Sequence, residues 1–274
     1  MLSRFSLSAH RRLLQTMVRI VPVPVREDNY AYLLIDTHTN KAAVVDPFDT
    51  PKVLKAAQEQ GVDIVACLTT HHHFDHSGGN QALANAIPNI PIYGGSKQGQ
   101  AVNHIVKDND EFTLSQDIHV KCLATPCHTQ DSICYYITSP NTSPNAPGSV
   151  FTGDTLFIGG CGRFFEGTAA EMHAALSYLG TLPDDTVVYN GHEYTKGNWA
   201  FAKSVDGENQ AVKDRLGGLV KEEKSTTGLT TIGDEKAWNP FMRLGVESIK
   251  NATGAATDVE VMEKLREMKN NYRG

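Results

Sequence analysis

The stretch from Thr69 to Gly79 constrains the fold and the chemistry of this chain more than any other. It follows an apolar run at residues 64–68, which is typical of a short buried strand. Two of its histidines are two residues apart, a spacing that points both imidazoles to the same side of an extended segment. Because α/β folds place their chemistry at the carboxyl ends of strands, we expect ligands to gather here. The four candidates are His71, His73, Asp75 and His76.

A solvated polar loop is the alternative interpretation of this stretch. A single histidine usually has such a role, but clustering this much polarity costs free energy unless an ion compensates for it. The His-Glu-x-x-His helix of metalloproteases is excluded, because its histidines lie four residues apart on one helical face. The pair Gly78-Gly79 predicts a sharp turn before a helix that begins near Asn80. We interpret the stretch as part of a metal site.

Isolated residues of the same kind follow three further predicted strands. They are His128, Asp154 and His192. Each alone is more often a capping or hydrogen-bonding residue than a metal ligand, but four strand ends that all carry His or Asp favour a shared site. Seven side chains suffice for two ions if the carboxylate of Asp154 bridges them. Mixed imidazole and carboxylate ligands suit zinc, iron or manganese, so the ligand type does not select the metal.

The composition predicts a soluble intracellular protein. The chain has 274 residues, 40% of them hydrophobic, which is enough for a full core in one or two domains. A net charge of −6 gives no basic footprint for nucleic acid, and no apolar run has membrane-spanning length. The five cysteines are an odd number without a C-x-x-C pair, which argues for a reducing compartment.

Residues 1–16 differ from the rest of the chain. They contain three arginines and several serines, and no acidic residue occurs before Glu27. This composition fits a mitochondrial transit peptide, and the alternative is a disordered tail. Met17 precedes the first predicted strand and would be a second start for a cytosolic form. We therefore expect the mature protein in the mitochondrial matrix, in the cytoplasm, or in both.

The hydrophobic pattern predicts two mixed sheets with helices outside, over residues 17–192. The chain opens with β-branched and aromatic runs that indicate an antiparallel meander, and residues 139–148 predict an exposed loop rich in Pro, Asn and Ser. Strands are expected at 18–25, 30–35, 42–45, 64–68, 91–93, 112–114, 118–124 and 133–137, and helices at 51–60 and 81–86.

The pattern changes after His192, where strand signals disappear. We expect a second, all-helical domain over residues 193–274. Thr257 and Glu260 have the spacing of a capping box for its last helix. The helices are expected at 198–205, 208–223 and 258–270, with a polar, Thr- and Gly-rich linker at 225–233.

The motif Thr-His-x-His-x-Asp-His at residues 70–76 resembles the signature of the metallo-β-lactamase superfamily. The longer run THHHFDHSGGN resembles the glyoxalase II branch, the hydroxyacylglutathione hydrolases, as do GCGRFFEGT at 160–168, GHEYT at 191–195 and NPFMR at 239–243. The resemblance extends from about Met17 to the C-terminus. It implies an α+β fold, a metallo-β-lactamase-like αββα sandwich with a C-terminal helical domain that binds the substrate.

The same resemblance implies two divalent metal ions, with zinc expected first and iron or manganese as alternatives. One ion takes His71, His73 and His128. The other takes Asp75, His76 and His192. Asp154 and a hydroxide bridge the two ions, so that Asp75 and Asp154 have catalytic roles as well as being ligands.

The activity that the resemblance implies is thioester hydrolysis, by a monomer, of S-D-lactoylglutathione to glutathione and D-lactate. This is the second step of methylglyoxal detoxification. Two positions depart from the family pattern: Phe165 stands where tyrosine is common, and residues 130–132 replace a turn of small residues. The substrate contacts implied are Arg163, Phe165, His192, Tyr194, Arg266 and Lys269.

Two other functions stay open on the sequence. Persulfide dioxygenases of the same superfamily carry a motif similar to Gly-Cys-Gly-Arg, but they use a single iron and lack the helical extension. A zinc-stabilised interaction protein without catalytic activity is the other alternative. Structural zinc is usually held by thiolates, and none of the seven candidate ligands is a cysteine.

Overall fold

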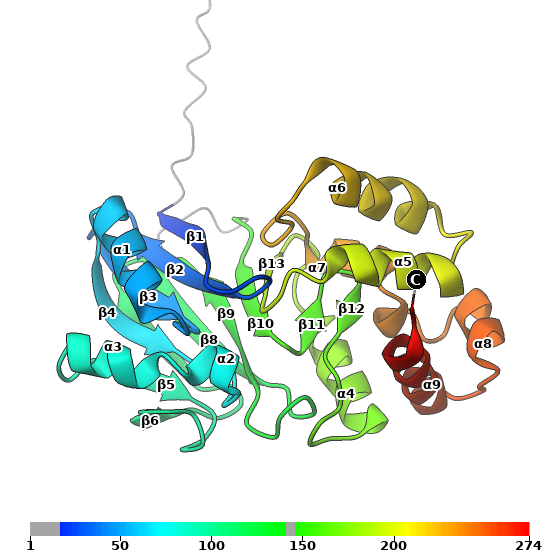
Figure 1. Cartoon of the computed structure of the whole chain (residues 1–274), viewed down its shortest axis with the longest axis horizontal. Helices are drawn as coiled ribbons and strands as arrows, with labels where there is room; N and C mark the ends of the chain where they lie inside the picture. The colour runs from blue at the N-terminus through cyan, green and yellow to red at the C-terminus, as the bar shows by residue number, and fades with distance from the viewer. Residues whose placement is uncertain (1–16, 141–145, 274) are drawn as a thin grey trace, which may run out of the picture.

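The computed structural model describes residues 17–140 and 146–273, in which two β-sheets pack face to face (Figure 1). The first sheet has its six strands in sequence order, antiparallel from β1 to β3 and parallel from β3 to β6. Its strands are β1 (Val18–Pro24), β2 (Tyr30–Asp36), β3 (Lys41–Val45), β4 (Asp63–Leu68), β5 (Ile92–Gly94) and β6 (His104–Ile105).

The second sheet has the order β13-β10-β9-β8-β7, with β13 and β10 parallel and the other neighbours antiparallel. Tyr32 and Leu34 of β2 pack between the sheets with Tyr135 and Phe151, because alternate side chains of a strand point to the same face. The strands are β7 (Glu111–Ser115), β8 (Ile118–Ala124), β9 (Ile133–Thr138), β10 (Ser149–Gly153) and β13 (Val187–Asn190).

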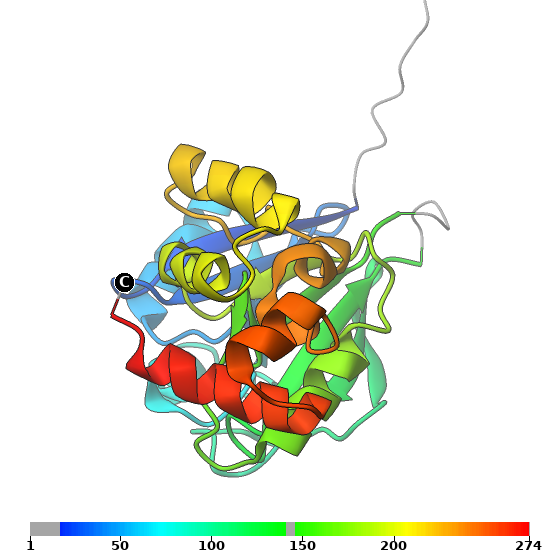
Figure 2. The same ribbon diagram turned by 90° about the vertical axis from the view of Figure 1, so that its right-hand side faces the viewer.

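Helices cover the outer face of each sheet, so the predicted αββα sandwich is confirmed (Figures 1 and 2). Val53 of α1 and Leu83 of α3 pack on the first sheet, and Met172 of α4 packs on the second. The helix α1 begins at an Asp49 cap and ends at Gly61, whose φ of 65° suits glycine. These helices are α1 (Thr50–Gln60), α2 (Phe74–Ser77), α3 (Asn80–Ala86) and α4 (Ala169–Leu179).

After β13, every regular element of the described chain is helical, as predicted. The last helix begins at the predicted capping box of Thr257 and Glu260. The single helix expected at 208–223 is instead a π-helical turn followed by a short α-helix. The elements are α5 (Thr195–Val205), η1 (Ala211–Leu216), α6 (Gly217–Glu222), α7 (Ile232–Trp238), η2 (Pro240–Met242), α8 (Glu247–Thr253) and α9 (Asp258–Asn271).

The Thr- and Gly-rich linker expected at 225–233 connects α6 to α7, which begins at Ile232, and it packs against the second sheet. Thr226, Thr227 and Thr230 are buried. The segment runs beside β13, where Val188 N–H donates to Thr230 O at 2.9 Å and Gly228 N–H donates to Val188 O at 2.9 Å. Because these backbone groups pair with the sheet edge, the helical region is joined to the second sheet by more than the covalent chain.

A third, two-stranded sheet lies where the second sheet meets the helices, and the sequence did not predict it. Its strands are β11 (Leu156–Phe157) and β12 (Gly160–Cys161), which pair antiparallel as a hairpin. Strands of two residues are too short to leave an alternating pattern. This hairpin forms one wall of the site described below.

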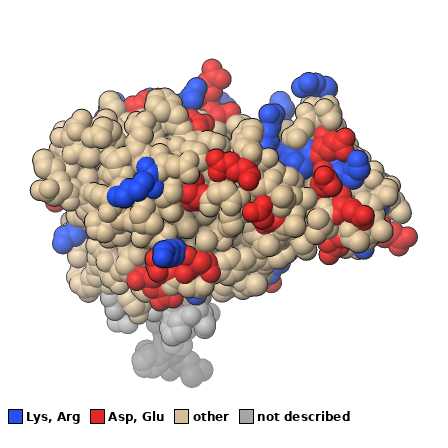
Figure 3. All heavy atoms as spheres, turned by 90° about the horizontal axis from the view of Figure 1, so that it is seen from below, with Lys and Arg blue, Asp and Glu red and all other residues tan. Residues whose placement is uncertain are grey.

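The distribution of charge on the surface and the length of the helices are relevant to the prediction that the protein binds neither nucleic acid nor a membrane. Acidic and basic side chains lie interspersed at the helical end of the face that Figure 3 shows, without a broad basic patch there. Over residues 17–140 and 146–273, no helix is long and apolar enough to cross a bilayer. The possible targeting segment at 1–16 and part of the 139–148 loop lie outside the described residues.

Candidate active site

The Thr69–Gly79 stretch leaves β4 as a loop and continues into α2. Asp46, which directly follows β3, anchors this loop: its carboxylate accepts a hydrogen bond from the Thr70 N–H at 2.8 Å and from the Thr70 hydroxyl at 2.6 Å. Gly78 and Gly79 form the predicted turn before α3, and they do so without a left-handed backbone, since Gly79 has an ordinary φ of −89°. Glycine is needed there because a Cβ would lie only 1.7 Å from Pro47 O.

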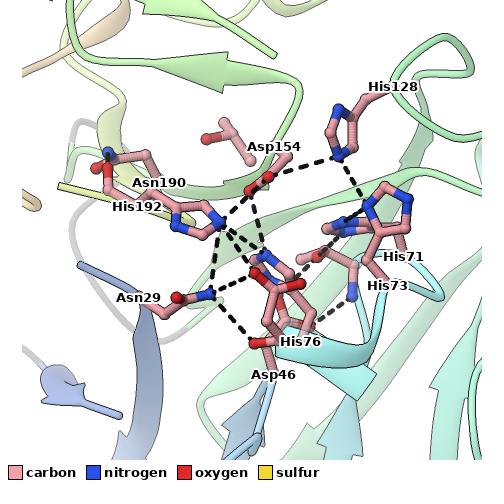
Figure 4. A network of polar contacts seen from close by, with 12 residues as sticks. Asn29, Asp46, His71, His73, His76, His128, Asp154, Asn190 and His192 are labelled. Carbon is pink, nitrogen blue, oxygen red and sulfur yellow. Dashed lines mark hydrogen bonds and ion pairs between the residues drawn. The ribbon is translucent and has the colours of Figure 1, made fainter. Parts of the chain in front are cut away.

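Three imidazoles form a first ligand group (Figure 4). His73 Nδ1 lies 3.1 Å from His71 Nε2 and 3.0 Å from His128 Nε2. His71 and His73 follow β4 of the first sheet, whereas His128 follows β8 of the second. The group therefore forms only where the two sheets meet.

A second group lies beside the first and contains Asp75, His76 and His192. His76 Nε2 and His192 Nε2 are 3.2 Å apart, and His192 Nε2 lies 3.7 Å from Asp75 Oδ2. His192 follows β13, so this group also joins both sheets.

Asp154 lies between the two groups, directly after β10 (Figure 4). Its Oδ2 is 3.5 Å from His128 Nε2 and 3.3 Å from His192 Nε2, and its Oδ1 is 3.3 Å from His76 Nε2. Oδ1 is buried and has no hydrogen-bond partner. All seven residues that the sequence nominated as ligands thus converge, with one carboxylate placed between two sets of three.

Four of the histidines use Nδ1 for a neighbour and direct Nε2 into the cluster. His128 Nδ1 lies 2.9 Å from the carbonyl oxygen of Arg163, which can only accept, so the proton sits on Nδ1. Such contacts fix the tautomer and leave the Nε2 lone pair for a metal ion. The other pairs are His71 with the Thr70 hydroxyl at 3.0 Å, His76 with Asp46 at 2.9 Å, and His192 with Asp28 at 3.1 Å.

The electrostatics of the cluster suit a cation. Burial lowers the pKa of His71, His73 and His128, so these imidazoles are neutral ligands. Burial opposes the ionisation of Asp154, but the neighbouring His76 and His192 outweigh it and hold the pKa of this carboxyl well below its usual range. The first group thus offers neutral imidazoles beside an ionised carboxylate, a donor set for a divalent metal. Asp154 outweighs burial and raises the pKa of His76 and His192, so an ion at the second group would displace their protons.

The spacing of the donors gives a second test of that fit. Zinc–nitrogen bonds of about 2.0–2.1 Å in a tetrahedral site place the ligand nitrogens about 3.3 Å apart. The separations of 3.0–3.2 Å between ring nitrogens in the two groups are close to this value. With the unpartnered Asp154 oxygen between them, these residues fit a divalent metal centre.

A cavity of about 500 Å³ adjoins this cluster and is lined by His128 and Asp154 at one end. Its other walls come from the β11–β12 hairpin, the loop after it, α5 and α9. Five of the six nominated substrate contacts line it: Arg163, Phe165, Tyr194, Arg266 and Lys269. The sixth, His192, is not among the lining residues; its ring stacks on that of Tyr194, with centroids 4.7 Å apart.

The two cations of α9 that line the cavity form different hydrogen bonds. Arg266 is buried, and its Nη1 donates to the carbonyl oxygen of Cys161 at 2.9 Å. Lys269 Nζ donates to Gly197 O at 2.7 Å, and burial, with the nearby Arg266, lowers its pKa to about 8. The Phe165 ring is 60% exposed and lies against the rings of His73 and His128, so it covers part of the first ligand group.

Sequence reasoning missed the side chains that hold the ligands in place. Asp46 follows β3 directly, and the rule that found Asp154 after β10 would have found it too. Asn29 precedes β2, and its Nδ2 donates to Asp75 Oδ2 at 3.1 Å. No local pattern marks Asp28 or Asn29, because their partners lie more than 40 residues away in the chain.

Family models match nearly the whole described chain. Residues 25–192 match the metallo-beta-lactamase superfamily, and residues 193–272 match the hydroxyacylglutathione hydrolase C-terminus. The chain is 47% identical over 248 residues to the probable hydroxyacylglutathione hydrolase glo2 of Schizosaccharomyces pombe, covering 89% of this chain and 93% of that protein. It is 41% identical over 261 residues to the cytoplasmic hydroxyacylglutathione hydrolase of Arabidopsis thaliana, covering 94% and 100%.

Solved structures share the same architecture. ETHE1 from Myxococcus xanthus is similar with a TM-score of 0.64 at 26% identity, covering 93% of this chain and 90% of that one. TTHA1623 in a di-iron-bound form has a TM-score of 0.52 at 25% identity, covering 63% and 92%. The chain belongs to the hydroxyacylglutathione hydrolase, or glyoxalase II, family of the metallo-β-lactamase superfamily.

Proposed function

We propose that this protein is a hydroxyacylglutathione hydrolase that cleaves S-D-lactoylglutathione into glutathione and D-lactate. The observation that carries the proposal is the juxtaposition of the seven-ligand cluster with a cavity that has three cationic side chains in its walls. Glutathione has two carboxylates and one ammonium, so a site that holds it needs cations and hydrogen-bond donors. The relatives named hydroxyacylglutathione hydrolase support the same substrate.

We propose two divalent ions per chain, with zinc the expected metal and iron or manganese the alternatives. His71, His73 and His128 would hold one ion, Asp75, His76 and His192 the other, and Asp154 both. When bound, such a centre supplies Lewis acidity and a water whose pKa is lowered to about 7. The solved structure of TTHA1623 in a di-iron-bound form supports the count of two.

The residues of the chain bind and orient the substrate in this proposal. Arg163, Arg266 and Lys269 attract the carboxylates of the tripeptide, and Tyr194 adds a hydroxyl donor. These contacts place the thioester carbonyl at the end of the cavity that Asp154 lines. The leaving group is a thiol with a pKa of roughly 8–9, so it departs as thiolate without a general acid, whereas an amide would require one.

Hydrolysis of S-D-lactoylglutathione by the purified protein is the test, with Asp154→Asn as the inactivating variant. An amide bridges two cations poorly. Mutation of a residue that only hydrogen-bonds to a metal ligand already lowers activity by about 10–100-fold, so we expect loss of the bridging ligand itself to lower activity by at least about 100-fold. Asp63→Asn is the matched control, because Asp63 is an exposed carboxylate on β4. A wild-type protein without thioesterase activity, or a fully active Asp154→Asn protein with its full metal content, would refute the proposal.

We further propose that the protein is a monomer of the mitochondrial matrix, the cytoplasm, or both. The arginines and serines of residues 1–16 support import, and Met17 offers a start for a cytoplasmic form. A fluorescent fusion with and without residues 1–16 tests the localisation. Mitochondrial targeting that does not depend on these residues would contradict it.

A further inference from the structure

The β11–β12 hairpin separates the substrate cavity from the interior of the helical region. On the cavity side, Phe157 and Cys161 are lining residues, and the Cys161 carbonyl accepts a hydrogen bond from Arg266. The turn of the hairpin is Ile158-Gly159, with Gly159 at a φ of 67°. A two-stranded sheet with two residues in each strand has too few internal hydrogen bonds to fix its own position.

Side chains of the helical region bind the backbone of the hairpin from its other side. Glu235 Oε2, on α7, accepts a hydrogen bond from the Gly159 N–H at 2.8 Å. Asn239 Nδ2, at the end of α7, lies 3.0 Å from Gly160 O and 3.3 Å from Phe157 O. Glu235 and Asn239 are both fully buried, and neither lines the cavity.

The hydrogen-bond donors and acceptors of these two side chains complement those of their neighbours. Glu235 Oε2 also accepts from Asn239 Nδ2 at 2.9 Å, and Oε1 accepts from Trp238 Nε1 at 3.1 Å, so the carboxylate faces donors only. Asn239 Nδ2 faces acceptors only. A buried carboxylate with its donors matched in this way is costly to rearrange, because any replacement leaves an unpaired polar group.

We propose that Glu235 and Asn239 are positioning residues for substrate binding. They hold the hairpin so that the Cys161 carbonyl keeps Arg266 in the wall of the cavity. This inference rests on the proposed function, since Arg266 is a substrate contact in it. It also gives a role to the Asn239-Pro240-Phe241 motif, which lies away from every candidate metal ligand in the chain.

The first readout is independent of activity. The experiment uses the metal-loaded protein. Asn239→Ala removes the side chain that donates to both hairpin carbonyls. Glu235→Gln replaces one acceptor oxygen by an NH₂ group, which then faces another hydrogen-bond donor. We expect hydrogen–deuterium exchange of residues 156–161 to rise by about tenfold or more in Asn239→Ala, and by less in Glu235→Gln. Asp206→Asn is the matched control: Asp206 is a buried carboxylate of the same region that binds Ser248 and Arg243 but not the hairpin.

The second readout separates positioning from general stability. We expect Asn239→Ala to raise KM for S-D-lactoylglutathione about tenfold, with little change in kcat or metal content, because the loss of one buried contact is worth about that factor. A small thioester without the tripeptide should be cleaved as by the wild type, and Asp206→Asn should leave both KM values unchanged. A purely structural role would lower stability in all three variants and leave KM for the folded protein unaltered.

Three outcomes overturn the inference: unchanged exchange in the hairpin, increased exchange with unchanged KM, or an equal rise in KM for both thioesters. If the wild-type protein does not cleave S-D-lactoylglutathione, that result refutes the proposed function and not this inference. The exchange experiment alone would then decide whether Glu235 and Asn239 anchor the hairpin.

Discussion

At the scale of single residues, Asp154 connects the two ligand groups of the site. Its two oxygens face nitrogens of three histidines, one on α2 and the others after β8 and β13, so one carboxylate links ligands from both sheets. The imidazoles are in turn oriented by Asp46, Asp28 and the carbonyl of Arg163. The positions of the ligands are therefore set by neighbours that contribute nothing to the cluster directly.

We expect Lys269 to make substrate binding depend on pH. Its ammonium form exists below its pKa, which burial lowers to about 8, so raising the pH through this value removes the charge. If the ammonium binds a substrate carboxylate, kcat/KM for S-D-lactoylglutathione falls by about tenfold between pH about 7 and pH about 9.5, the worth of one charge-assisted hydrogen bond. Steady-state rates across this range, corrected for spontaneous hydrolysis, measure the fall.

The control for this prediction is Lys269→Arg, because a guanidinium stays charged throughout the range. We expect the alkaline fall to disappear in this variant, and to be absent in both proteins for a thioester without the tripeptide. Wild-type and Lys269→Arg proteins with the same pH profile would show that Lys269 does not bind the substrate charge.

At the scale of elements, the site depends on close contact between the segments that follow β3 and β4. Gly79 is the N-cap of α3 and lies against the backbone of Pro47, the residue after Asp46. A Cβ at Gly79 would push Pro47, and with it Asp46, away from Thr70 and His76. The ligand loop is thus positioned by backbone packing as well as by hydrogen bonds.

We expect Gly79→Ala to destabilise the protein by about 1–3 kcal/mol, the usual cost of overpacking, and to lower its metal content. The matched variant is Gly218→Ala on α6, where no heavy atom lies within 4 Å of the added Cβ. That change should stabilise the protein by about 0.5–1 kcal/mol, because alanine favours a helix over glycine. Urea unfolding and elemental analysis measure both effects, and a Gly79→Ala protein as stable as Gly218→Ala would contradict the argument.

Elements with a strong local pattern could be predicted from the sequence, and the contacts between them could not. The strands that precede His71, His128, Asp154 and His192 are apolar runs with polar ends, which is why the cluster could be predicted. The β11–β12 hairpin has no such pattern, and Glu235 reads as an ordinary acidic residue in the first turn of a helix. Its burial and its contact with Gly159 arise from packing across 76 residues of chain.

For the whole molecule, the site exists only when three parts are assembled. The first sheet provides the ligand loop, the second provides His128, Asp154 and His192, and the helical region provides Arg266 and Lys269. The sequence predicted these parts and the linker at residues 225–233, but it did not predict that threonines of the linker are buried. Polar threonines suggest exposure, yet here they pair with the edge of β13, an interaction that only the folded chain specifies.

The central claim is that a two-metal centre, held by seven side chains, hydrolyses a glutathione thioester. Titration of the metal-free protein with zinc, with bound metal and S-D-lactoylglutathione hydrolysis measured on the same samples, tests it most directly. We expect activity to rise until about two ions are bound per chain and then to stay constant. Full activity with a single iron per chain, or thioesterase activity in the metal-free protein, would contradict the claim.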